Sequence, residues 1–99
     1  MREVVYHPRV PNEARELVEY YDGILTELGI RFWGELIAAI KHAQKHPEMH
    51  HFDYLGGGLR RSNLKKFPVH FLFRVFPEKI RITVVKHHKR RPTYGIRRK

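Results

Sequence analysis

Apolar residues in the first half of the chain recur with the spacing of an α-helix. Between residues 10 and 29 they fall three or four positions apart, at Ala14, Leu17, Val18, Tyr21, Leu25 and Leu28. This spacing predicts an amphipathic helix with one buried face. Asn12 is the expected N-cap, and Gly29 is the expected end, because glycine tolerates the left-handed conformation that often follows a helix.

The same spacing returns between residues 30 and 47. The apolar positions of this second segment are Phe32 or Trp33, then Leu36, Ile37, Ile40 and Ala43. It predicts a second amphipathic helix, which Pro47 ends. Because almost no linker separates the two segments, we expect an antiparallel helical hairpin.

The pattern elsewhere is that of β-strands. Residues 3–6 predict a short N-terminal strand, and residues 48–58 a loop that ends in three glycines. Residues 59–67, 68–76 and 80–86 predict three strands joined by short connections, which pair antiparallel. We expect Val69, Phe71 and Phe73 on one face of the central strand, and Ile80, Ile82 and Val84 together on one face of the last strand.

These elements predict an α+β fold formed by an N-terminal strand, an antiparallel two-helix hairpin and a three-stranded antiparallel meander. We expect residues 1–99 to form a single domain with the helices on one sheet face. The other face is then left for the cations of the strands and of the C-terminal segment, which we expect to continue the last strand and cap the sheet.

Composition narrows the possible classes. The chain has no cysteine, which excludes disulfides and thiolate metal sites. The N-terminal residues lack the apolar core of a signal peptide, and no apolar stretch approaches the about 18 residues of a membrane span. We therefore expect a cytoplasmic protein without a membrane partner.

Charge is distributed unevenly along the chain. Residues 1–57 hold six Lys/Arg and nine Asp/Glu, whereas residues 58–99 hold fourteen Lys/Arg and one acid, Glu78. The net charge of +10 is thus the sum of −3 in the first part and +13 in the second. This asymmetry indicates a basic face that meets a polyanion or an acidic partner, and a merely solubilising surface is the alternative.

Two groups of residues could support chemistry. His42 and His46 lie one helical turn apart, with His50 and His51 just beyond, a spacing that can bind a metal; a solvated polar face is the favoured interpretation, so we expect neither a metal nor a cofactor. Arg74 interrupts an apolar strand, where it either meets an anion or is capped by an acid.

Cleavage of RNA without a metal is the second chemistry to consider. It needs a base for the ribose hydroxyl, cations for the phosphorane charge and an acid for the leaving oxygen. The cations are abundant, and His87, His88 or Tyr94 could act as base or acid. A packing role for Tyr94 is the alternative.

Three segments, taken in order, resemble the RelE/ParE superfamily of type II toxin–antitoxin toxins, and its ParE-like branch most closely. "NEARELVEYYDGILTELGIRFWGEL" resembles the family's helical hairpin, and "GLRRSNLKKFPVHFLFRV" its strand segment with the Phe-Pro step. "ITVVKHHKRRPTYGIRR" resembles its ending, with His87, Arg90, Pro92, Tyr94 and Arg98 on the marked positions. The chain departs from the family at Gly95, where a tryptophan is frequent, and at Val69, where an aromatic is frequent.

The resemblance implies a growth-inhibiting toxin, of a kind also linked to plasmid stabilisation, that a cognate antitoxin encoded by an adjacent gene neutralises in a toxin–antitoxin complex. ParE-like members are associated with inhibition of DNA gyrase, and RelE-like members cleave mRNA on the ribosome. The candidate catalytic residues are His87, Arg90 and Tyr94. The candidate target- or RNA-binding residues are the cations Arg60, Arg61, Lys65, Arg74, Arg91 and Arg98.

Three functions remain open at the level of sequence. The first is a toxin that acts by binding a target such as gyrase, and the second is a metal-independent endoribonuclease that acts on ribosome-bound mRNA. The third is a basic nucleic-acid-binding module, whose affinity would fall steeply with salt.

Overall fold

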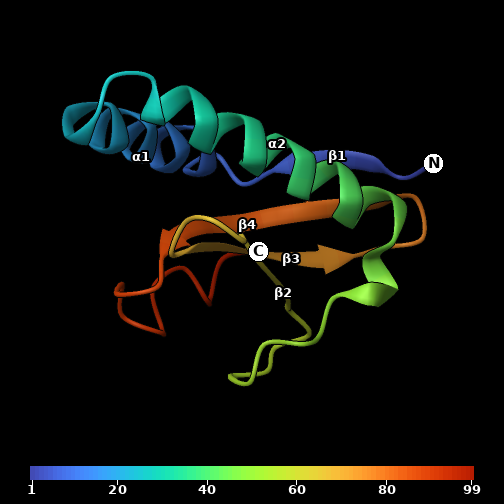
Figure 1. The fold of residues 1–99 in the computed structure, drawn as a ribbon. Helices are drawn as coiled ribbons and strands as arrows, with labels where there is room; N and C mark the ends of the chain where they lie inside the picture. The colour runs from blue at the N-terminus through green and yellow to red at the C-terminus, as the bar shows by residue number, and fades with distance from the viewer.

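Two helices lie on one face of a four-stranded sheet in the computed structural model, which describes residues 1–99 (Figure 1). The elements are β1 (Glu3–Tyr6), α1 (Val10–Ile24), α2 (Leu28–Lys45), the short 3-10 helix η1 (Pro47–Met49), β2 (Arg60–Asn63), β3 (Val69–Val75) and β4 (Lys79–His87). The strand order is β1-β4-β3-β2, with β1 parallel to β4 and the other pairs antiparallel. The predicted α+β fold is confirmed.

The helical hairpin differs from its prediction at both ends of the first helix. The helix begins at Val10 rather than after Asn12, whose side chain instead accepts a hydrogen bond from Arg15. It ends at Ile24, and Gly29 lies in α2 rather than at the end of α1. The N–H of Gly29 donates to Asp22, and a Cβ on this residue would stand 2.5 Å from the carbonyl oxygen of Val18. Gly29 is therefore required by the close approach of the two helices.

The main core lies between the helices and the sheet. Phe71 and Phe73 of β3 point toward the helices, where they meet Phe32 and Leu36 of α2 and Tyr21 of α1 in one cluster of buried residues. Trp33, the alternative to Phe32 in the helical pattern, is 47% exposed. Neither helix has the combination of length and hydropathy that crossing a membrane requires.

A β-bulge changes the predicted faces of the last strand. Leu72 pairs with Val84, but the next residue, Phe73, pairs with Ile82, so Thr83 is the extra residue. The extra residue reverses the alternation, and Val84 points away from Ile80 and Ile82. The prediction that these three share a face is wrong, because a bulge leaves no signal in the alternation.

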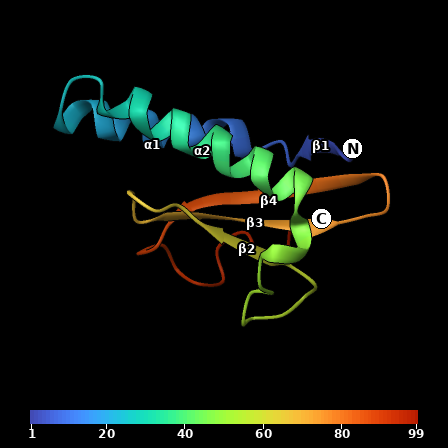
Figure 2. The same ribbon diagram turned by 45° about the vertical axis from the view of Figure 1, so that its right-hand side comes forward.

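The opposite side of the sheet is called the tail face here, because the C-terminal segment, residues 88–99, crosses it (Figures 1 and 2). Leu59, Leu72 and Val84 form a small buried cluster on this face, and Tyr94 and Ile96 of the C-terminal segment pack against it. The loop before β2 also lies on this side of the sheet in both views (Figure 2). The C-terminal segment thus caps the sheet, as expected.

Candidate functional site

A buried carboxylate holds the C-terminal segment in place. β1 ends at Tyr6, so the edge of β4 beyond Ile82 has no neighbouring strand. Glu13 of α1 reaches this edge and accepts the backbone N–H of Val85 at 3.2 Å. The same carboxylate accepts the hydroxyl of Tyr94 at 2.6 Å and pairs with the guanidinium of Arg98 at 2.7 Å.

Lys86 holds the start of the same segment. Its side chain is almost fully buried, and its ammonium group donates to the carbonyl oxygens of Arg91, Pro92 and Tyr94. Burial lowers the pKa of this ammonium group. The three carbonyls satisfy its donors, which a buried ammonium group requires.

Above these contacts, the tail face carries a small hollow that we call the basic cleft. Its lining includes one acid and five basic side chains, namely Asp53, Arg61, His70, Lys86, His88 and Arg90. The cleft has a volume of about 100 Å³, which suits one anionic group rather than a nucleotide. Arg61 lies 3.7 Å from the carboxylate of Asp53, so this acid partly balances the cations.

Two histidines form one wall of the basic cleft. The rings of His70 and His88 stack with centroids 5.0 Å apart, and their Nδ1 atoms are 2.9 Å apart. Burial, and then Arg61, lowers the pKa of His70 to about 3, and the same two causes lower the pKa of His88. His70 is therefore neutral near pH 7, and its imidazole is a weak base.

The three candidate catalytic residues do not share a cleft. His87 lies on the α1 side of the strand end, where it lines a hollow with Glu16, Leu17 and Tyr20. Arg90 borders both this hollow and the basic cleft. The guanidinium of Arg90 lies 4.0 Å from the ring centroid of Tyr94, whose hydroxyl is already bound to Glu13.

The candidate binding cations are also dispersed. Arg61 lines the basic cleft, whereas Arg98 is nearly buried against Glu13. Arg74 donates to the carbonyl of Gly57, a backbone acceptor that neither interpretation of this residue named.

The other three cations lie at separate places. Arg60 donates to the carbonyl of His50, and its guanidinium lies over the ring of Phe52. Lys65 lies on the α2 side of the sheet, and Arg91 is exposed in the C-terminal segment. A single patch formed by all the predicted cations is therefore absent.

The residues that organise the site were not singled out from the sequence. Glu13 lies near a helix N-terminus, where an acid is favourable in any case, and Asp53 lies in a loop, so neither position signals its role. A signal was nevertheless present for Lys86, since an ammonium group in a β-strand between apolar residues must find acceptors.

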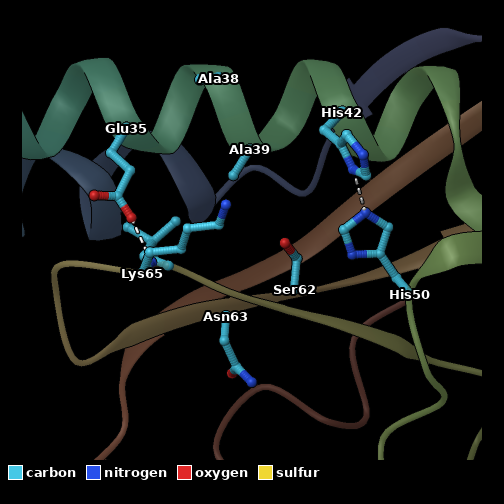
Figure 3. A pocket seen from close by; sticks show the side chains of 9 residues that line it. Glu35, Ala38, Ala39, His42, His50, Ser62, Asn63 and Lys65 are labelled. Atoms are coloured by element: carbon cyan, nitrogen blue, oxygen red, sulfur yellow. Dashed lines mark hydrogen bonds between the residues drawn. The ribbon is translucent and has the colours of Figure 1, made fainter.

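A second hollow lies between α2 and the edge of β2 (Figure 3). His42 and His50 face each other across it, with Nδ1 of the former 3.0 Å from Nε2 of the latter. No group of three or more His, Asp or Glu side chains is arranged to hold a metal ion. One ring nitrogen of each histidine is thus engaged by the other ring.

The chain resembles a known protein in its fold but matches none in its sequence. No protein-family model matches the sequence, and no curated protein matches it. A solved structure described as the "Chromosomal ParDE TA system from P. aeruginosa" contains a chain of similar fold, with a TM-score of 0.78. The fold is ParE-like. The RelE/ParE resemblance is thereby confirmed at the level of the fold.

The two chains are only 16% identical, although the alignment covers 88% of this chain and 96% of that one. At this identity, the shared fold does not show that the two chains have the same target. What the ParE-like fold of this chain offers chemically is a small cleft with Arg61, Arg90 and His88, suited to one phosphate or carboxylate group.

Proposed function

We propose that this chain is the toxin of a type II toxin–antitoxin system and that it inhibits an essential target, such as DNA gyrase, by binding it. The observation that carries the proposal is the ParE-like fold, shared with a chain of a ParDE system over nearly the whole length. The concentration of positive charge in residues 58–99 supports it, because a basic surface accelerates association with acidic partners.

The contacts of Tyr94 favour action by binding over catalysis. A general acid must have a proton to give, and the hydroxyl of Tyr94 already donates to Glu13, beside the guanidinium of Arg98. His87 lies outside the basic cleft, and His70 inside it is a weak base with a pKa of about 3. The cations of the cleft remain suited to holding an anionic group of a target.

The test is an assay of DNA supercoiling by gyrase with the purified chain. We expect inhibition that the pair Arg61→Ala with Arg90→Ala weakens about tenfold or more, because both cations border the basic cleft. Arg97→Ala with Lys99→Ala is the matched control, since it also removes two cations, and both residues are exposed and line none of the hollows described above. Unchanged supercoiling at excess of the chain would count against gyrase as the target.

A metal-independent mRNA endoribonuclease is the second candidate. The observation that favours it is the grouping of Arg61, His88 and Arg90 around a cleft the size of a phosphate group. Primer extension on translated mRNA would then show cuts linked to codons, which Arg90→Ala and Tyr94→Phe abolish. Intact transcripts during growth arrest would exclude this activity.

The proposed system includes an antitoxin encoded beside this gene. Expression of the chain alone should arrest growth, and expression together with the neighbouring reading frame should restore it. Normal growth of cells that accumulate the folded chain would contradict the proposal for any target.

A further inference from the structure

The loop before β2 presents apolar side chains to solvent. Phe52 is 61% exposed, Tyr54 76% and Leu55 39%, all within four consecutive residues. We call residues 50–58, which carry them, the aromatic loop; it projects from the sheet on the side of the tail face (Figures 1 and 2). Single exposed apolar residues are common on proteins, whereas several together on one projecting loop indicate a surface that another molecule covers.

The aromatic loop is held in one conformation by contacts within the fold. The N–H of Asp53 donates to the carbonyl of Leu59 at 2.7 Å, and the buried carboxylate of Asp53 accepts the N–H of Leu55. Arg74 of β3 donates to the carbonyl of Gly57, and the three glycines of the loop have φ between 73° and 81°. Because the loop is ordered before a partner arrives, binding does not bear the entropic cost of ordering it.

The aromatic loop also forms a wall of the basic cleft. Tyr54 and Leu55 line this cleft together with Arg61, His88 and Arg90. The exposed apolar side chains and the cations are therefore parts of one continuous surface. Aromatic residues and arginine are the types enriched at the energetically dominant centres of protein–protein interfaces.

We propose that the aromatic loop and the basic cleft together bind a protein on which a carboxylate lies beside an apolar surface. The carboxylate enters the cleft beside Arg61 and Arg90, and the apolar surface covers Tyr54 and Leu55. This inference rests on the proposed function, because it assigns the surface to the target of the toxin. The cations of the cleft attract any anion, so the loop is the part that selects the partner.

A single-stranded nucleic acid fits this surface less well. Such a ligand stacks successive bases on aromatic rings along a groove that follows several phosphates. The basic cleft has room for one anionic group, Leu55 has no ring, and the guanidinium of Arg60 already covers one face of Phe52, 4.2 Å from the ring centroid. A second copy of the chain is disfavoured because it carries the same net charge of +10.

The first test is a titration of the isotope-labelled full-length chain with phenylpropionate, followed by NMR. This probe combines one carboxylate with one apolar ring, and its size leads us to expect a millimolar affinity. The amide signals of Tyr54, Leu55 and Arg61 should shift together, and the neutral phenylpropionamide should bind more weakly. Absence of these joint shifts, or equal affinity for the amide, would overturn the proposal.

Parallel titrations distinguish the other possible occupants. Tighter binding of uridine monophosphate than of ribose phosphate would show that the aromatic loop stacks a base, and would assign the surface to a nucleic acid. Binding of the chain to phosphatidylglycerol vesicles that Tyr54→Gln abolishes would assign it to a membrane. Shifts at the loop on raising the concentration of the chain alone would assign it to a second copy. Each of these three results would replace the proposal.

The second test uses the toxin activity itself. Phe52→Gln with Tyr54→Gln should raise about tenfold the amount of chain that arrests growth, and leave the urea midpoint nearly unchanged because both side chains are exposed. Ile24→Gln with Leu25→Gln is the matched control. It removes two apolar side chains that are 59% and 57% exposed, at the turn between α1 and α2, away from the tail face (Figure 1). Equal effects of the two pairs would contradict the proposal.

The two tests separate this inference from the proposed function. A chain that arrests growth equally well with and without the rings of Phe52 and Tyr54 keeps the proposed function and loses the aromatic loop as its target surface. A chain that never arrests growth but binds phenylpropionate at the loop and the cleft loses the proposed function. It keeps a surface that recognises a carboxylate beside an apolar group.

Discussion

Glu13 connects three parts of the molecule through one side chain. Its carboxylate meets the edge of β4, the hydroxyl of Tyr94 and the guanidinium of Arg98, and it is 9% exposed. Burial opposes the charge of Arg98, but the hydrogen bond and charge of Glu13 outweigh it, so that the pKa of Arg98 is raised. Through Tyr94 and Arg98, this one side chain of α1 fixes the C-terminal segment to the rest of the fold.

Replacing this carboxylate should therefore destabilise the fold. Glu13→Gln leaves the guanidinium of Arg98 nearly buried without a countercharge, and we expect a loss of about 3 kcal/mol in the free energy of unfolding. Urea denaturation measures the loss. Glu16→Gln, at an exposed position of the same helix, is the control and should change the free energy by less than about 0.5 kcal/mol. An equal loss in free energy of unfolding for Glu13→Gln and Glu16→Gln would contradict a structural role of Glu13.

His70 should make the stability depend on pH. Its pKa falls from the ordinary 6.5 to about 3, so below about pH 6.5 the unfolded chain binds a proton that the folded chain does not. Stability is thus lost as the pH falls from about 6.5 toward about 3, with a contribution of at most about 1.4 kcal/mol per pH unit from this residue.

Urea midpoints across this pH range test the dependence. His70→Asn should flatten the curve more than the control His46→Asn, which removes a histidine from an exposed position. The buried His70 also faces Arg61, Lys86 and His88, which add to the unfavourable charge when it is protonated. A curve of the same slope in His70→Asn would contradict this account.

At the scale of elements, the two glycines of α2 provide a matched pair. A Cβ at Gly29 would stand 2.5 Å from the carbonyl oxygen of Val18, whereas a Cβ at Gly34 would meet nothing within 4 Å. Gly29→Ala should lower the free energy of unfolding by about 1–3 kcal/mol, because the helices must separate. Gly34→Ala should raise it by about 0.5–1 kcal/mol through helix propensity. Thermal unfolding of both variants measures this difference in sign.

The elements themselves were predictable, and their junctions were not. Helical and alternating spacings placed β1, both helices, β3 and β4 close to their observed bounds, whereas β2 ends at Asn63 and is shorter than the strand predicted over residues 59–67. Gly29 was taken for a helix end because a glycine at a tight crossing and a glycine after a helix have the same sequence signature. The face of Val84 was predicted wrongly because of the bulge at Thr83. A bulge depends on how the strand pairs with its partner, and the sequence of the strand alone does not show it.

The site was less predictable than the fold, because it depends on pairings across the whole molecule. The parallel pairing of β1 with β4 decides where the edge of β4 becomes free and therefore where Glu13 binds. His70 and His88 meet only because β3 and β4 pair in their particular register. Composition did show that the second half is basic. It did not show that Arg74 and Arg98 would bind groups of the chain itself, namely the carbonyl of Gly57 and the carboxylate of Glu13.

The net charge of +10 gives the last prediction, which concerns the whole molecule. Like charges repel in the folded chain, and salt screens this repulsion as the Debye length falls from about 30 Å at about 0.01 M to about 3 Å at about 1 M. The buried pair of Glu13 and Arg98 is screened much less. The Tm should therefore rise with sodium chloride, by about 4 °C for each kcal/mol of repulsion removed. Arg61→Ala with Arg90→Ala should reduce this rise, because it removes two cations of the basic cleft. A Tm that falls with salt would mean that exposed ion pairs, and not repulsion, dominate the electrostatics of the fold.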